Sequence, residues 1–319
     1  MRGIYGGIRI NFRPLSLKSL IAANAPTGII RVAVQGKREA SGYAVTVDTS
    51  RSRIRLYCDE RMLSYDFSRF SVNDPSVTGK SLEKGVTFTP RQGRTLKEIL
   101  SGTPGRIIFA CNGETDNMWA ANSIMISEGK LITRTAPGVH TRSRIPLNGS
   151  YSFFVFDADK AGIKHLNFAN GELNSPLDFR NGIRGPVIIS RGRSQVASLK
   201  FAGEKTPNVK QNDVLWESDT FQAAMTAVGR VANGNIVFIS LAGNPSKHNE
   251  ILVSDLTDAL LELGASEAIM LGLSGDVQQY IRMPKGKNHW LIARPRMGSS
   301  MEFVFPGGRP LSSAILVEG

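Results

Sequence analysis

The chain has 319 residues, of which 41% are hydrophobic, a composition typical of a globular protein with one large core or two smaller ones. Its longest apolar run falls well short of the roughly 20 residues that span a bilayer, which argues against a transmembrane helix. The 39 Lys and Arg residues outnumber the 27 Asp and Glu residues, and the formal net charge of +12 favours polyanionic partners.

Cysteine content and the N-terminal sequence bear on the compartment. The two cysteines, Cys58 and Cys111, provide neither a disulfide framework nor metal-ligand spacing, which favours a reducing compartment. The apolar stretch at residues 15–25 is interrupted by Lys18 and Asn24, so it does not form a continuous signal-peptide core. We therefore expect a cytoplasmic location, or a virion-associated one if the protein is viral.

Basic residues are concentrated at the front of the chain. Residues 1–57 contain only two acidic residues, Glu39 and Asp48, against ten basic ones: Arg2, Arg9, Arg13, Lys18, Arg31, Lys37, Arg38, Arg51, Arg53 and Arg55. This segment predicts binding to nucleic acid or another polyanion, and the alternative is a solubilising surface without a specific partner. We predict a basic arm or lead-in over residues 1–41 and one domain over residues 42–319.

The first half of the predicted domain contains several strands. Residues 43–47 and 54–58 alternate in polarity around a polar turn and predict a hairpin. Residues 95–100 predict a short helix ending at Gly102. A buried strand at 107–111 leads into a polar loop at 112–117, and residues 124–133 predict a second hairpin.

The second half adds further strands and the strongest helix. Strands are expected at 153–156 and 186–189, and the Asn233-Gly234 turn predicts a hairpin of 227–231 with 236–240. A helix over 255–263, capped by Ser254 and closed by Gly264, precedes a strand at 268–273. A helical turn over 276–281 and closing strands at 301–305 and 314–317 complete the pattern. With 32 glycines, the chain is predicted to form an α+β, sheet-rich mixed fold with a few helices on a central sheet.

The order of these motifs resembles the phosphodiester glycosidase superfamily, in both its uncovering-enzyme and its bacterial branches. The resemblance covers residues 42–317 and rests on an opening Val-Asp hairpin, an Asn-Gly loop, a Gly-Pro strand, an Ala-Val-Gly strand and a closing leucine-rich helix with its Gly-rich turn. In that order, the motifs stand at residues 45–48, 109–113, 185–192 and 227–229, and the closing helix with its turn stands at residues 260–271 and 274–280. The resemblance implies hydrolysis of a sugar-phosphate diester and implies no cofactor.

Three positions depart from the family pattern. Ser274 occupies the place of the usual aspartate, or Gly272 does if the gap is placed differently. Met225 stands in place of an arginine, and Glu114 in place of the second glycine of the Asn-Gly-Gly loop. Two hypotheses therefore stay open: a hydrolase with an altered site, or a family member that binds a polyanion or serves in assembly without turnover.

Paired carboxylates carry out the acid and base steps of glycoside cleavage. Glu114 and Asp116 beside Asn112, together with Asp276, are the candidates for this work, with Asn112, Glu114 and Asp276 nearest the reacting bond. The alternative is that Glu114 and Asp116 only stabilise a surface turn.

The Ser274-Gly275 turn, placed before a predicted helical turn, predicts a phosphate site built from backbone N–H groups. Gln278 and Gln279 add neutral donors, and Arg230 or Arg184 could reinforce it, although an arginine is more often a solvated surface residue. The histidines, His140, His165, His248 and His289, have no metal-ligand spacing, so no metal is predicted.

Overall fold

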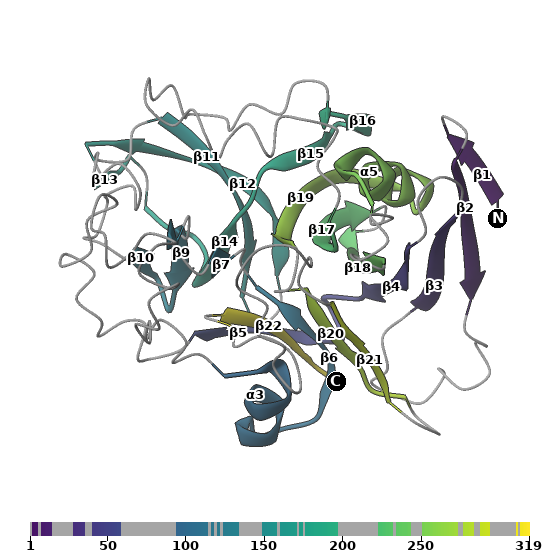
Figure 1. The fold of residues 1–319 in the computed structure, drawn as a ribbon. Helices are drawn as coiled ribbons and strands as arrows, with labels where there is room; N and C mark the ends of the chain where they lie inside the picture. Colours follow the sequence, from purple (N-terminus) through teal and green to yellow (C-terminus); the bar gives the residue numbers. More distant parts are fainter. Residues whose placement is uncertain are drawn as a thin grey trace, which may run out of the picture.

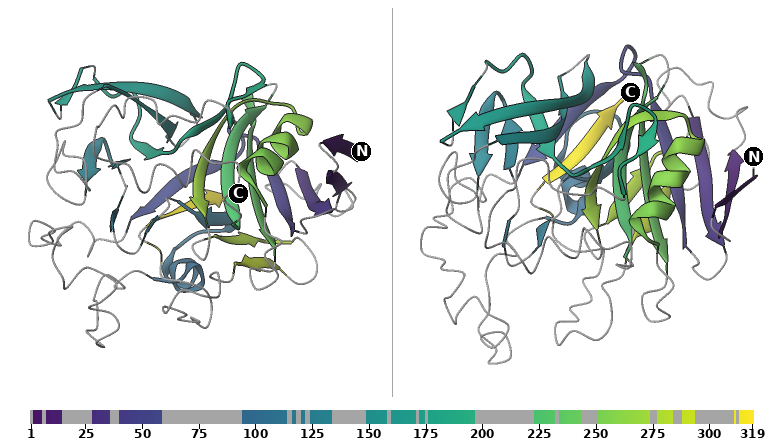
Figure 2. Two further views of the ribbon diagram at one scale, coloured as in Figure 1. Left: turned by 45° about the horizontal axis from the view of Figure 1, so that its top comes forward. Right: turned by 90° about the horizontal axis from the view of Figure 1, so that it is seen from above.

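A computed structural model of the chain describes residues 2–5, 8–14, 28–35, 40–58, 94–113, 116–117, 120–121, 124–133, 149–157, 160–170, 172–174, 176–196, 223–231, 234–243, 251–273, 277–283, 288–293, 311 and 313–319. Strands dominate this part of the chain, which holds only two helices, α3 (Leu96–Gly102) and α5 (Val253–Glu262). The predicted α+β fold class is therefore wrong, and the protein is a β-rich fold of curled sheets (Figures 1 and 2). Neither described helix is long and apolar enough to cross a membrane.

The largest sheet has nine strands in the order β1-β2-β3-β4-β18-β17-β19-β15-β16. Its strands pair antiparallel throughout. Their bounds are β1 Arg2–Tyr5, β2 Ile8–Pro14, β3 Gly28–Gln35, β4 Ala40–Val47, β15 Val187–Ser190, β16 Arg193–Ser194, β17 Met225–Val231, β18 Ile236–Gly243 and β19 Ala265–Leu273. The predicted lead-in over residues 1–41 thus contributes three strands that continue this sheet beyond β4, while the domain boundary proposed at residue 42 stays a prediction.

Three smaller sheets complete the fold. The five-stranded sheet has the order β21-β20-β6-β22-β5, with β5 Arg53–Cys58, β6 Ile107–Asn112, β20 Gln278–Ile281, β21 His289–Ile292 and β22 Ser313–Glu318. The six-stranded sheet has the order β10-β9-β14-β11-β12-β13, with β9 Ile124–Ser127, β10 Lys130–Thr133, β11 Gly149–Phe156, β12 Ala161–Ala169, β13 Glu172–Leu173 and β14 Asn181–Arg184. The short pair is β7 Asp116–Asn117 with β8 Ala120–Ala121.

The central core lies where the three large sheets meet. Buried residues from all three contribute to it, among them Phe238 of β18, Phe109 of β6 and Phe154 of β11. Phe238 packs against both other rings, with centroids 5.0 and 5.7 Å away. The opposite face of the nine-stranded sheet is covered by α5, whose Leu256 and Leu260 are fully buried there (Figure 1). The strand ends that border this central core therefore have their positions fixed from several sides.

The predicted hairpin of residues 43–47 with 54–58 is wrong, although both strands exist. β4 pairs with β3 and β18 in the nine-stranded sheet, whereas β5 pairs with β22 in the five-stranded sheet. Asp48 accepts hydrogen bonds from the backbone N–H and the hydroxyl of Ser50 at 2.9 and 2.6 Å, an Asx-type turn in which the chain changes sheet. These hydrogen bonds lower the pKa of the exposed Asp48 carboxyl.

The two helices confirm the sequence pattern but differ in their caps. Thr95 caps α3 in a capping box with Glu98, and the helix ends at Gly102 as predicted. Helix α5 begins two residues before the predicted Asp255, because the Asp255 carboxylate accepts the backbone N–H of Leu252 at 2.9 Å. Ser254 is thus inside the helix, and its predicted role as the cap is wrong. Gly264, at φ 84°, closes the helix as expected.

The predicted helical turn over residues 276–281 is also wrong. Residues 278–281 form strand β20, which pairs with β6 on one side and β21 on the other. All four side chains are buried, so their lack of a clear period of two in the sequence reflects burial on both faces. The predicted hairpins β9–β10 and β17–β18 are confirmed.

Candidate functional site

The candidate site is organised around Asn112, the last residue of β6, whose side chain is fully buried. Its Oδ1 accepts hydrogen bonds from the Thr226 hydroxyl at 2.8 Å and from the backbone N–H of Gln278 at 3.2 Å. A backbone N–H can only donate, so the atom facing Gln278 must be the amide oxygen. The orientation of the Asn112 amide is therefore fixed, and its NH₂ group points away from both partners.

This NH₂ group has no hydrogen-bond partner among the described residues. It lies against Gly272 of β19, where an added Cβ would stand only 1.9 Å from Nδ2. A buried amide donor without a partner costs free energy, so its presence calls for a structural or functional explanation. Glycine at position 272 is required by this close approach, so an aspartate placed there would collide with Asn112.

Two further side chains extend the hydrogen bonds from Asn112. The hydroxyls of Thr226 and Ser240 lie 3.1 Å apart, and Oε1 of Gln278 accepts the backbone N–H of Leu96 at 3.2 Å. All of these side chains are buried. We call Asn112, Thr226, Ser240 and Gln278 the Asn112 cluster.

The Asn112 cluster joins strand ends that are far apart in the sequence. It connects the end of β6, the start of β17, the end of β19 through Gly272 and the start of β20. Gly113 follows β6 directly, and its backbone N–H donates to the Ser313 carbonyl at 3.0 Å. Gly113, Leu273 and Val277, the chain neighbours of Asn112, Gly272 and Gln278, therefore lie beside this cluster.

The predicted site residues are distributed unevenly over the structure. Asn112 and Gln278 are brought together, 166 positions apart in the chain. Glu114, Ser274, Gly275 and Asp276 lie outside the described residues, as does the side chain of Asp116, whose backbone belongs to β7. The first four belong to the two segments that adjoin the Asn112 cluster in sequence.

The other predicted residues take different places. Gln279 is buried and donates from Nε2 to the Tyr43 carbonyl at 3.1 Å, while its Oε1 has no partner within the described part of the chain. Arg230 is exposed and stands four residues beyond Thr226 on β17, about 13 Å along the strand. Arg184 is buried, with its guanidinium 4.8 Å from the centre of the Tyr151 ring. Arg184 thus belongs to the six-stranded sheet, and Arg230 to the end of β17 remote from the Asn112 cluster.

Met225, which stands where the resemblance places an arginine, is fully buried. It belongs to the apolar cluster under α5, together with Leu241, its partner on β18. The neighbouring Thr226 belongs instead to the Asn112 cluster. Position 225 is therefore an apolar core position in this protein.

Sequence reasoning missed Thr226, Ser240 and the role of Gly272. Thr226 and Ser240 stand inside apolar strands, where a lone hydroxyl residue gives no functional signal. Ser240 ends one strand of the predicted hairpin and Thr226 directly precedes the other, and the observed register puts the two residues opposite each other. The contact with Asn112 joins different sheets, so no local pattern marks it.

The side chains of the Asn112 cluster are all neutral amides and hydroxyls. Next to it, Cys111 is fully buried, and burial raises the pKa of its thiol. Among the described residues, the Asn112 cluster itself therefore offers no carboxylate for acid or base catalysis. Among the described residues, no three His, Cys, Asp or Glu side chains form a group that could hold a metal ion.

Comparison with known proteins identifies the fold. No protein-family model matches the sequence, and no curated protein matches it. The structure is similar to the catalytic domain of zebrafish N-acetylglucosamine-1-phosphodiester alpha-N-acetylglucosaminidase, auto-inhibited by its pro-peptide, with 14% identity, a TM-score of 0.55 and coverage of 97% of this chain and 88% of that chain. A hypothetical protein from Synechocystis matches with 12% identity, a TM-score of 0.48 and coverage of 98% and 68%. The first similarity establishes a distant relationship of fold to a phosphodiester glycosidase.

Proposed function

We propose that this chain is a hydrolase that cleaves a sugar-phosphate diester beside the Asn112 cluster. One observation carries the proposal: the hydrogen bond from the Gln278 backbone N–H to Asn112 Oδ1 holds the end of β6 against the start of β20. The segment with Glu114 and the segment with Ser274, Gly275 and Asp276 therefore both adjoin this contact. Their convergence on one site is what the hydrolase proposal requires.

The proposed roles follow from the chemistry of glycosidic cleavage. One carboxyl group protonates the leaving oxygen, and a second acts as base or nucleophile. We assign these roles to Glu114 and Asp276, with Asp116 in support, and leave their order open. Backbone N–H groups of the Ser274-Gly275 turn would hold the phosphate. Because β20 is a strand, no helix dipole contributes to this anion site.

Asn112 has a positioning role in this proposal. Its oxygen is already committed to Thr226 and Gln278, and its buried NH₂ group remains available. That donor is available to orient a substrate oxygen or a group of an adjoining segment. Gln279 supports the site by tying β20 to β4 through the Tyr43 carbonyl.

The experiment is hydrolysis of a panel of sugar 1-phosphodiesters by the whole chain and by two variants, Glu114→Gln and Asp276→Asn. Each variant is expected to lower kcat/KM at least about 100-fold, the typical contribution of a general acid or base. Glu128→Gln and Asp178→Asn are matched controls, because these exposed carboxylates pair with Arg180 and Lys164 in the six-stranded sheet region. Turnover that falls equally in all four variants would contradict the assignment.

A second candidate function is favoured by the burial of Met225 in apolar surroundings: a protein that keeps the fold and binds a polyanion without turnover. Among the described residues of the basic front, Arg31, Arg51 and Arg53 are exposed, whereas Arg55 pairs with Glu318 at 2.5 Å.

The second candidate predicts that affinity for polyphosphate falls steeply between 50 and 200 mM salt, on the order of tenfold or more. The double variant Arg51→Gln with Arg53→Gln should bind more weakly than the control Arg191→Gln with Arg193→Gln, which alters an exposed turn elsewhere. Affinity independent of salt would reject this candidate.

A further inference from the structure

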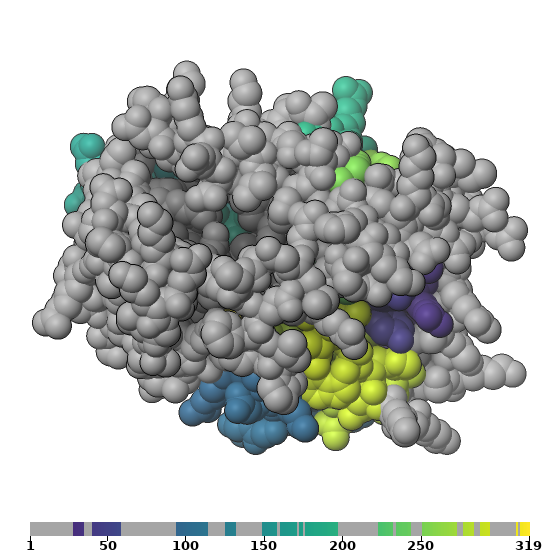
Figure 3. Space-filling view, in the orientation of Figure 1, coloured from purple at the N-terminus to yellow at the C-terminus, as the bar shows by residue number. Residues whose placement is uncertain are grey.

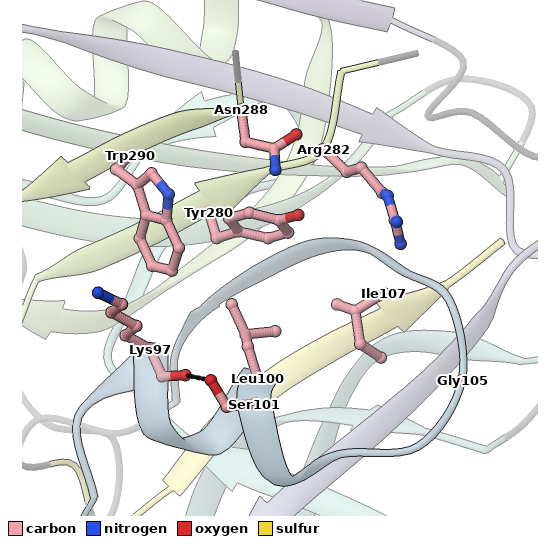
Figure 4. Close-up of a pocket in the computed structure, with 9 residues that line it drawn as sticks. All are labelled: Lys97, Leu100, Ser101, Gly105, Ile107, Tyr280, Arg282, Asn288 and Trp290. Carbon is pink, nitrogen blue, oxygen red and sulfur yellow. Dashed lines mark hydrogen bonds between the residues drawn. The ribbon is translucent and has the colours of Figure 1, made fainter. Parts of the chain in front are cut away.

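A surface pocket of about 280 Å³ lies between helix α3 and the β20–β21 hairpin (Figure 4). Figure 3 shows the two elements side by side at the lower edge of the molecule, α3 in blue and the hairpin in yellow-green. The residues that line the pocket are Lys97, Leu100, Ser101, Gly105, Ile107, Tyr280, Arg282, Asn288 and Trp290. The pocket is separate from the Asn112 cluster, because no residue of that cluster lines it.

An aromatic pair forms one wall of the pocket. Tyr280 and Trp290 face each other across the β20–β21 ladder, with ring centroids 4.7 Å apart. Tyr280 is buried, but Trp290 is 40% exposed. It is one of two large hydrophobic side chains that are exposed among the described residues. An exposed indole beside a pocket offers a flat surface on which a planar ring can stack.

Two cations border the same pocket. Lys97 comes from α3 and Arg282 follows β20, and in Figure 4 they stand on either side of Tyr280. Both are exposed. None of the nine lining residues is acidic, and Glu318, which lies beside Gly105 at one end, is already paired with Arg55. The net charge of the pocket therefore favours an anion.

The neutral polar groups are few. Ser101 donates its hydroxyl to the Lys97 carbonyl at 2.9 Å, and the Asn288 oxygen accepts the Met283 N–H at 3.2 Å. The Asn288 NH₂ group and the Tyr280 hydroxyl remain as neutral groups for a ligand. A polyhydroxylated sugar would bury hydroxyls without enough partners, whereas a flat base with an anionic end needs few hydrogen bonds.

From this arrangement we infer that the pocket binds one nucleotide unit, with the nucleobase stacked on Trp290 and the phosphate held by Lys97 or Arg282. The volume suits a single unit, and the Asn288 amide can donate to an acceptor on the base edge. The inference is independent of the proposed hydrolysis. The unit can come from a free nucleotide or from single-stranded nucleic acid, which present the same chemistry to the pocket.

The test is isothermal titration calorimetry of the whole chain with four probes: adenosine monophosphate, adenosine, ribose 5-phosphate and inorganic phosphate. The nucleotide is expected to bind at least about fivefold more tightly than each fragment, because only it engages both the indole and a cation. Binding of ribose 5-phosphate as tight as that of the nucleotide would overturn the inference.

Variants separate the two parts of the pocket. Trp290→Ala should weaken nucleotide binding by roughly fivefold to a hundredfold, and Lys97→Gln or Arg282→Gln should weaken it and reduce its salt dependence. Ile292→Ala is the matched control, since Ile292 is equally exposed two residues along β21 but does not line the pocket. Lys130→Gln, an exposed lysine in the six-stranded sheet, controls for charge.

A single-stranded oligoadenylate, titrated in parallel, distinguishes the two sources of the unit. Tighter binding of the oligonucleotide than of the mononucleotide, with both weakened in Trp290→Ala, supports the pocket and assigns it to nucleic acid. Binding of both, lost in the same variant, supports a site open to either source. If neither probe depends on Trp290 while thermal melting shows Trp290→Ala to be folded, the inference is wrong.

Discussion

Met225 and Thr226 are neighbours on β17 and are equally buried, yet they belong to different parts of the molecule. Met225 lies in the apolar cluster under α5, where its contacts are with hydrocarbon. Thr226 faces the other way and donates its hydroxyl to Asn112. Strand β17 thus separates an apolar cluster from a cluster of buried, hydrogen-bonded polar side chains.

The two clusters differ in the substitutions that they tolerate. In the apolar cluster the effect of a substitution on stability depends on the volume of the new side chain and on whether it carries a charge. In the Asn112 cluster it depends on how many buried donors and acceptors lose their partners. The four substitutions that follow test this contrast.

The largest effect is expected from Met225→Arg, which restores the residue of the family pattern. A guanidinium buried among the side chains of the α5 cluster is left without a described partner, so unfolding free energy should fall on the order of 4 kcal/mol or folding should fail. Chemical denaturation measures this, with Met283→Arg at a partly buried position as the milder control. A stable Met225→Arg variant would show that the two sides of β17 differ less than their packing indicates.

Asn112→Ala is expected to follow, with a loss of about 2–3 kcal/mol. It removes the acceptor of both the Thr226 hydroxyl and the Gln278 N–H and leaves them buried without it. Asn181→Ala is the comparison, because the Asn181 oxygen accepts the Glu128 N–H at 3.3 Å in a more exposed place. Equal losses in urea denaturation would argue that the Asn112 cluster has no special role in tying strands together.

Gly272→Ala should cost about 1–3 kcal/mol, because the new methyl group overlaps the Asn112 amide and both residues are buried. Gly162→Ala provides the matched control, since a Cβ at that position meets no heavy atom within 4 Å. The difference in melting temperature between the two variants measures the steric effect. No difference would mean that the Asn112 side chain can move aside.

Thr226→Val is the mildest change, with an expected loss of about 1 kcal/mol. Asn112 keeps its hydrogen bond from Gln278, whereas the bond from the Thr226 hydroxyl and the contact of that hydroxyl with Ser240 both disappear. In an Asn112→Ala background the same substitution should cost less, because the shared bond is already absent. A double-mutant cycle measures this coupling, and strict additivity would contradict it.

Local patterns in the sequence predicted about half of the described strands, because alternation and turn chemistry act within a few residues. The Asn233-Gly234 turn correctly marked the β17–β18 hairpin. The pairing of strands that are distant in the sequence was not predictable in the same way. Asp48 marked a turn, but the sequence did not show whether the chain reversed or changed sheet there. That outcome depended on the distant partners of β4 and β5, which are β18 and β22. The overestimate of helix had a local cause, since residues 278–281 are buried on both faces and show no strand period.

The candidate site was predictable only in part. Asn112 was identified from its loop motif, whereas no local pattern marked its contact with Gln278, 166 positions away. Thr226 and Gly272 contribute through contacts between sheets, which a single sequence does not record. Whether Glu114 and Asp276 converge stays a prediction.

We propose that the Glu114 and Asp276 carboxylates meet beside the Asn112 cluster. The decisive experiment is a crystal structure of the chain soaked with a sugar 1-phosphate. The proposal predicts the phosphate on the Ser274-Gly275 turn, with the Glu114 and Asp276 carboxyl groups roughly 5–10 Å apart around the sugar. Carboxylates that point away from each other, with no phosphate on the turn, would contradict the hydrolase proposal and leave the polyanion-binding protein as the better interpretation.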